Sequence, residues 1–339
     1  MRFLYLIAFL LLFFESFSQT DTKFWFSAPE VNRYHLGSNG GNNGKAVRLR
    51  ITASDFVGID PIKGFNVRLS MPANLAFTPV VRTLTPAEPT ITIELGPYVN
   101  NTATSIENRL LYSSSDISGV VKYINRANKG LLLESINVDD PTKPGRPITA
   151  YYEIGIDYNM DLISLKGGNA LGKEFYVPFQ TTNDTEDASP AGRYYYNNKH
   201  YSSFDIVATE AATNVTIEPT YDVFVFGIVS ATPYMPKDIP FTIRLEKGQT
   251  AIIAPYQNNA LDYKTTWEAD KKLVGTYVTS NKNIAIITRD DLVTGKTTGG
   301  FSPGGVDYIS DQIVPTSLIG TKYAVIRGYL YGNATNNHE

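Results

Sequence analysis

Apolar and polar residues alternate along most of the chain after residue 20. The alternation is clearest in six segments, each with polar residues between its apolar ones: 47–51, 65–69, 91–95, 204–208, 215–217 and 241–245. A period of two places one side of a strand on a core and the other side in water, as in antiparallel sheets. Clusters of turn-forming residues, such as SNGG and SNKN, bound these segments. The pattern predicts an all-β protein built from short strands.

One short phrase occurs twice in the chain and begins a third time. It reads TKFWF around Phe24, GKEFYVPF around Phe175 and GTKYAVI around Tyr323, and these aromatic residues are 151 and 148 residues apart. A second phrase has nearly the same spacing. GLLLESINV around Ser135, followed by ITAYYEI, returns as GTYVTSNKNIAIIT around Ser280, with the two serines 145 residues apart. A fixed period indicates a structural unit that is repeated along the chain.

The repeat and the strand pattern together predict tandem antiparallel β-sandwich-like units with an internal repeat of about 150 residues. A β-propeller would need a period of only about 40–50 residues. We divide the chain into a signal peptide (1–18), a first β unit (19–165), a second β unit (166–318) and a last segment (319–339). The last segment would be the start of a truncated third unit, or else a strand that closes the second. In the first case Tyr323 should be more exposed than Phe175.

The N-terminus has the features of a secretory signal. Arg2 precedes an apolar run at 3–14, which is shorter than the roughly 20 residues of a membrane-spanning helix. Ser16 and Ser18 supply small residues before a cleavage site at Gln19. We therefore expect a secreted or cell-surface protein, on the extracellular side of a bacterial envelope, with no membrane-spanning segment in the mature chain.

Composition excludes several kinds of chemistry. The chain has no cysteine, which removes disulfides, thiolate catalysis and cysteine-based metal sites. An exported chain without disulfides must gain its stability from packing. The net charge is −3 and no run of Lys and Arg occurs, so the sequence carries no electrostatic signal for nucleic acid.

The densest acidic region contains Asp290, Asp291, Asp307 and Asp311, with a glycine-rich stretch between the two pairs. Carboxylates on a glycine-rich loop suit calcium, which prefers oxygen ligands. The spacing fits no EF-hand, and solvated turns explain the same residues. Calcium is the only cofactor that the sequence suggests.

The best candidate for ligand contact is a group of tyrosines in a polar segment. Tyr194, Tyr195, Tyr196 and Tyr201 flank asparagines and a histidine. Tyrosine combines a large contact area with a hydroxyl group and loses little conformational entropy on binding. The alternative is a tyrosine-rich strand packed on the sheet.

Two other patterns have simple structural explanations. Gly167, Gly172 and Lys173 have the spacing of a phosphate-binding loop, but Glu174 stands where a hydroxyl must hold magnesium, so we expect a turn leading into a strand. Glu134 and Asp205 lie beside hydroxyl residues in strand patterns, which is normal on an exposed sheet face.

Five phrases in order are specific to a known family: LGKEFYVPF, FDIVATEAATNVTIEPT, FTIRLEKGQTAII, LVGTYVTSNKNIAIIT and DQIVPTSLIGTKYAV. Over about 107–328 the chain resembles the IgGFc-binding protein N-terminal domain family. It is similar in particular to the versions in large secreted proteins of Bacteroidetes that are often linked to gliding motility or type IX secretion.

The resemblance implies an extracellular binding or adhesion module without catalytic residues, whose partner is an extracellular protein or a glycan. It gives no reason to assign immunoglobulin as the ligand. Two alternatives stay open: a carbohydrate-binding or carbohydrate-active protein, and a structural spacer that projects other domains from the cell.

Overall fold

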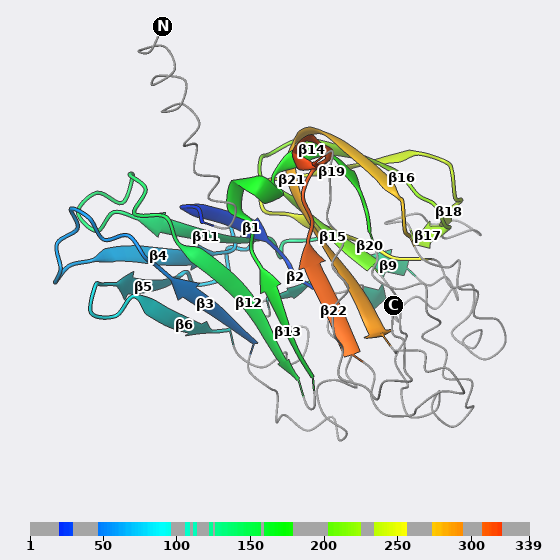
Figure 1. The fold of residues 1–339 in the computed structure, drawn as a ribbon. Helices are drawn as coiled ribbons and strands as arrows, with labels where there is room; N and C mark the ends of the chain where they lie inside the picture. The colour runs from blue at the N-terminus through cyan, green and yellow to red at the C-terminus, as the bar shows by residue number, and fades with distance from the viewer. Residues whose placement is uncertain are drawn as a thin grey trace, which may run out of the picture.

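The structure of the protein is a computed structural model, which describes residues 20–29, 47–95, 106–108, 111–113, 122–124, 126–156, 159–178, 203–224, 234–255, 273–293 and 307–320. These residues form strands and turns, with two short 3-10 helices and no α-helix among them. The main sheets are antiparallel (Figure 1). The predicted all-β antiparallel fold is therefore confirmed.

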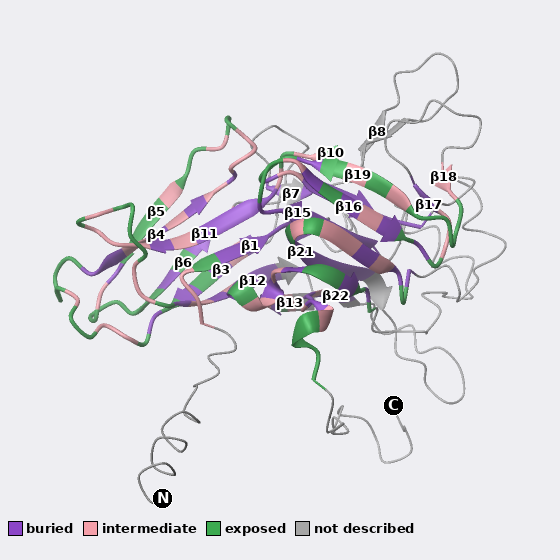
Figure 2. Cartoon of the chain, turned by 90° about the horizontal axis from the view of Figure 1, so that it is seen from above, coloured by how far each residue is buried: buried purple, intermediate pink, exposed green. Residues whose placement is uncertain are grey.

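The first unit consists of two four-stranded sheets. One sheet has the order β1 (Lys23–Phe26), β11 (Leu131–Ile136), β4 (Phe65–Ser70) and β5 (Val80–Leu84). The other has the order β13 (Asn159–Ser164), β12 (Thr149–Ile156), β3 (Val47–Thr52) and β6 (Thr90–Glu94). Buried and more exposed residues alternate along β3, β4 and β6, as the sequence pattern requires of strands with one side on a core (Figure 2).

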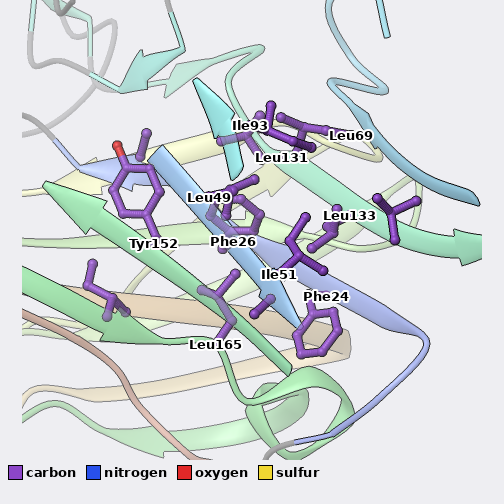
Figure 3. Packing of buried hydrophobic residues seen from close by; sticks show 14 of the residues in the cluster. Phe24, Phe26, Leu49, Ile51, Leu69, Ile93, Leu131, Leu133, Tyr152 and Leu165 are labelled. Carbon is purple, nitrogen blue, oxygen red and sulfur yellow. The ribbon is translucent and has the colours of Figure 1, made fainter. Parts of the chain in front are cut away.

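The core of the first unit fills the space between its two sheets. Phe24 and Phe26 on β1, Leu49 and Ile51 on β3, and Tyr152 on β12 are all fully buried (Figure 3). The rings of Phe26 and Tyr152 are tilted by 52° with centroids 5.8 Å apart, an arrangement that aromatic pairs favour. The phrase TKFWF is therefore a core strand, stabilised mainly by the apolar area that it removes from water.

The second unit is built around one long strand, β21 (Tyr277–Val293). The first part of β21 pairs with β14 (Gly172–Tyr176) and with β16 (Thr213–Glu218), and β19 (Phe241–Leu245) pairs with β16. The last part of β21 pairs with β15 (Ser203–Ala208) and with β22 (Asp307–Gln312), and β20 (Thr250–Ile253) pairs with β15. Apolar residues from β14, β15, β16 and β21 form a second core.

The two units have the same strand order, in the same sequence along the chain. The row β14–β21–β16–β19 corresponds to β1–β11–β4–β5, and the row β22–β21–β15–β20 corresponds to β13–β12–β3–β6. Phe24 pairs with Leu133, and Phe175 pairs with Val278, so the aromatic residue of the repeated phrase has an equivalent partner in each unit. A duplicated unit would give this arrangement, although the period of about 150 residues in the sequence stays a prediction.

Short elements complete the described structure. Three small ladders pair β2 (Ala28–Pro29) with β7 (Glu107–Asn108), β8 (Leu111–Ser113) with β9 (Lys122–Ile124), and β17 (Val223–Phe224) with β18 (Tyr234–Met235). The 3-10 helices η2 (Gly167–Ala170) and η4 (Thr316–Leu318) follow the last strand of each unit. One further strand, β10 (Arg126–Ala127), pairs with β20, so a segment assigned to the first unit extends a sheet of the second.

Some expectations fall outside the described residues. The signal peptide at 1–18 and Tyr323 lie there, so the comparison of Tyr323 with the fully buried Phe175 stays open. The proposed division of the chain also stays a prediction. Within the described residues, no helix has the length and apolar character needed to cross a membrane.

We predict that Leu49→Ala destabilises the protein strongly. Leu49 is fully buried between the two sheets of the first unit, and removing a buried leucine side chain costs about 2–5 kcal/mol of unfolding free energy. Leu75→Ala is the matched control, because Leu75 is fully exposed and its truncation should change stability by less than about 0.5 kcal/mol. Equal urea unfolding midpoints for the two variants would contradict this core assignment.

Candidate functional site

The predicted tyrosine site cannot be built from the structure. Tyr194, Tyr195, Tyr196 and Tyr201 lie outside the described residues, so their role in ligand contact stays a prediction.

The predicted calcium ligands lie on one antiparallel strand pair. Asp290 and Asp291 are on β21, and Asp307 and Asp311 are on β22. Asp290 is buried, whereas the Asp311 carboxylate is partly exposed and accepts a hydrogen bond from Lys166 Nζ at 2.7 Å. The side chains of Asp291 and Asp307 are outside the described part. No group of three acidic or histidine side chains suited to a metal occurs among the described residues, and calcium binding stays a prediction.

The segment with phosphate-loop spacing forms a turn and a strand. Gly167 lies in η2 with a φ of +54°, and β14 starts at Gly172. A phosphate-binding loop must instead lead into a helix whose N-terminus faces the phosphate. The predicted turn into a strand is therefore confirmed.

The described polar side chains are most densely buried where the two units meet. An apolar contact anchors this junction: Trp25 on β1 and Leu132 on β11 pack against Val207 on β15 and Ala285 on β21, and Leu171 adds to it. The first four are at most 5% exposed. The outer face of the sheet β1–β11–β4–β5 therefore packs, through Trp25 and Leu132, on the outer face of the row β22–β21–β15–β20.

A network around Asp205 continues the junction. The Asp205 carboxyl group accepts hydrogen bonds from Ser27 Oγ and from Asn108 Nδ2, both at 2.9 Å. Thr250 Oγ1 in turn donates to Asn108 Oδ1 at 3.0 Å. All four residues are fully buried. Asp205 and Thr250 lie on β15 and β20 of the second unit, Asn108 lies on β7, and Ser27 lies between β1 and β2. Buried polar groups need such partners, so the network fixes how the units are oriented.

Further hydrogen bonds extend along the same face. Arg289 Nε donates to Ser203 Oγ at 2.6 Å, and both residues are buried. Gln312 Nε2 donates to the backbone carbonyl of Trp25 at 2.8 Å, and Gln312 Oε1 accepts from the backbone N–H of Lys166 at 2.7 Å. The two bonds of Gln312 join β22 to β1 and to the linker between the units.

A carboxyl group at the edge of the junction has a shifted pKa. Asp161 on β13 accepts a hydrogen bond from Ser310 Oγ on β22. Burial raises the pKa of Asp161 above its usual value, and the hydrogen bonds from Ser310 oppose this only in part. The group serves a contact between the two units.

The structure corrects one interpretation of the sequence. Asp205 was expected on an exposed sheet face, but it is fully buried, as are its neighbours on both sides of β15. The alternation in β15 therefore separates two buried faces, because the first unit covers the side that would otherwise meet water. The signal in the sequence was the run SFDIVA itself, which is nearly continuous in apolar and small residues apart from Asp205. Glu134, by contrast, is only half-buried and pairs with Lys23 and Arg68.

The outer face of the sheet β13–β12–β3–β6 carries a ladder of charges. Glu153 binds Arg50 and, at 3.4 Å, Arg48, while Arg48 also contacts Glu94 at 2.9 Å. The hydrogen bond from Arg50 is the main reason why the pKa of Glu153 lies below its usual value. This face is polar and partly exposed.

The outer face of the other exposed sheet, β14–β21–β16–β19, carries tyrosines instead. Tyr176 on β14 is 56% exposed, and its ring centroid lies 4.8 Å from that of Tyr277 on β21. The Tyr277 hydroxyl donates to Glu174 Oε1 at 2.9 Å, which raises the pKa of Tyr277. This exposed aromatic pair was not singled out in the sequence, because its two tyrosines are 101 residues apart and only strand pairing brings them together.

Comparison with known proteins identifies one relationship. Residues 164–339 match the family model described as IgGFc binding protein. The match covers the whole second unit and the last segment, and it leaves out 107–163 of the range expected from the sequence. Neither the search of curated proteins nor the search of solved structures found a match.

We predict that Ser27→Ala weakens the junction. Removal of the Ser27 hydroxyl leaves the buried Asp205 carboxyl group without one donor, at a cost of about 1–3 kcal/mol in unfolding free energy. Thr83→Ala is the control, since its hydroxyl makes an equally short bond to Asn66 at an exposed site and should matter by less than about 0.5 kcal/mol. If chemical denaturation gives the same loss of unfolding free energy for both variants, the burial of the Asp205 network does not contribute to stability.

A second prediction concerns pH and the charge ladder. Because the folded state lowers the pKa of Glu153, its ion pairs stabilise the fold at pH values above the ordinary glutamate pKa of about 4.3. This contribution is lost as the pH falls through the lower pKa of the folded state. Wild type should therefore be more stable than Glu153→Gln at pH 7, and the difference should shrink below about pH 4. A constant Glu153→Gln difference from pH 7 to pH 3 would refute the assignment.

Proposed function

Because the chain belongs to the IgGFc-binding protein family, we propose that it is a secreted, non-catalytic binding module that acts in adhesion or surface interaction. Family membership is the observation that carries this proposal. The matched residues span the second unit, so the likeness involves a whole sandwich and not an isolated motif.

The features of the N-terminus support a location outside the cell, on the extracellular side of a bacterial envelope. Arg2, the short apolar run and the small residues before Gln19 are typical of a cleaved signal peptide. A cysteine-free exported protein must rely on packing, and the structure has extensive packing in its two cores and its junction. The partner would be an extracellular protein or a glycan.

The carboxyl groups with the clearest contacts support a binding role over a catalytic one. Glu153 serves the charge ladder, Asp161 bonds to Ser310 across the junction, and Asp205 holds Ser27 and Asn108. Each group therefore has a structural partner. We place ligand contact instead at the tyrosine segment that contains Tyr194.

Binding can be measured on the mature protein, residues 19–339, with a printed glycan array and with immobilised immunoglobulin G as a protein probe. We expect saturable binding to one of them. Changing Tyr194, Tyr195 and Tyr196 together to Ala should weaken it by about tenfold or more, since aromatic anchors dominate most interfaces. Tyr151→Ala, on the charge-ladder face, is the control and should bind normally.

Two results would contradict the proposal. Turnover of a polysaccharide by the wild-type protein would show an enzyme. No binding to any probe by a folded protein would favour a structural spacer.

A further inference from the structure

On the outer face of the sheet β14–β21–β16–β19, Tyr176 is exposed, whereas its counterpart in the first unit, Trp25, is covered. Strand order makes this sheet equivalent to β1–β11–β4–β5. In the first unit Trp25 pairs with Leu132, and in the second unit Tyr176 pairs with Tyr277 at the equivalent position. Trp25 is 3% exposed because the second unit packs on it, whereas Tyr176 is 56% exposed.

The segment after β22, which contains η4, has the same backbone arrangement as the segment after β13, which contains η2 and links the two units. The N–H of Leu165 bonds to the carbonyl of Ala150, and the N–H of Ile313 bonds to that of Ile286. A 3-10 helix follows in each case, η2 or η4. Each helix lies against the first strand of the unit that it follows, η2 against β1 and η4 against β14.

Apolar residues at the second of these joints are exposed. Leu171 after η2 packs into the junction, and Ala170 within η2 is fully buried. Their counterparts after β22 are Ile319 and Leu318, which are 49% and 50% exposed. Leu318 and Ile319 are therefore exposed to solvent, whereas their counterparts after β13, Ala170 and Leu171, are covered.

The opposite end of the two-unit body has a different surface. The outer face of β13–β12–β3–β6 in the first unit corresponds to the face of the second unit that carries Val207 and Ala285. In the first unit this face has the ladder of Arg48, Arg50 and Glu153. Arrays of stacked units end in polar faces and join through apolar ones. The charged face has the composition of a cap, whereas the part of the other face that carries Tyr176 and Tyr277 corresponds to the covered Trp25–Leu132 part of the junction.

We propose that the Tyr176–Tyr277 face is the docking surface for a further β-sandwich of the same kind, carried on the same chain after η4. That sandwich would present an outer face with small apolar residues, as the second unit presents Val207 and Ala285 to Trp25. Its docking would cover Tyr176, Tyr277 and Ile319. The proposal goes beyond the binding function and does not depend on which ligand the protein takes.

A protein surface fits this face better than a sugar does. The two tyrosine rings lie 4.8 Å apart and only 31° from parallel, so they pack on each other. Leu318 and Ile319 at the neighbouring joint offer no hydrogen bonds to hydroxyl groups. Tyrosine and aliphatic side chains together are typical of the centre of a protein interface.

Tyrosine nitration by tetranitromethane, followed by peptide mass spectrometry, tests the proposal. It compares the protein as its source secretes it with the recombinant 339-residue chain. In the secreted protein we expect nitration of Tyr176 to be slower by about tenfold, as its exposed fraction falls toward the 3% of Trp25. Tyr151 on the charge-ladder face is the internal control and should react equally in both samples.

One variant and gel filtration in high salt distinguish protection by the docked sandwich from protection by a separate molecule. Tyr176→Arg in the secreted protein should disrupt docking and restore nitration of Tyr277, whereas Leu162→Arg at an exposed site of the first unit should not. Equal reactivity of Tyr176 in the two samples overturns the proposal. Protection that disappears after gel filtration in high salt also overturns it, because the cover would then be a separate molecule.

Discussion

The burial of one sheet on both of its faces is the constraint on which the described structure depends. Strand β15 has six buried residues in a row, because one side faces the core of its own unit and the other faces the first unit. A strand in this position can carry a polar side chain only if that side chain finds partners. Asp205 finds them in Ser27 and Asn108, which lie 178 and 97 residues before it in the sequence. The two sandwiches are therefore joined by specific contacts as well as by apolar area.

Local patterns in the sequence were enough to predict the strands and the antiparallel all-β class, and the resemblance over five phrases predicted the family. Alternation in β3, β4 and β6 gives the buried side of each strand directly, because water lies on the other side. The junction was not predictable in this way. Whether Asp205 meets water or a second sheet depends on contacts between residues about 100–180 positions apart, as its bonds to Asn108 and Ser27 show. For the same reason, the pairing of Tyr176 with Tyr277 could not be predicted from the sequence.

The arrangement gives the binding function a physical setting. A body of two sandwiches joined by buried contacts can hold loops in fixed positions, and loops on a rigid scaffold carry much of the binding in β-sandwich proteins. Its two exposed sheet faces differ in chemistry: one has a ladder of paired Arg and Glu side chains, and the other has a tyrosine pair beside Glu174.

The central claim is that the junction makes the two units one cooperative body. Hydrogen exchange of the backbone amides in β3 and in β16, followed at increasing concentrations of denaturant, tests it most directly, since these strands lie in the two units away from the junction. The account predicts that both strands become exchangeable in a single opening with one free energy. Opening of β16 with a clearly lower or higher free energy than β3 would show two independent units and contradict the claim.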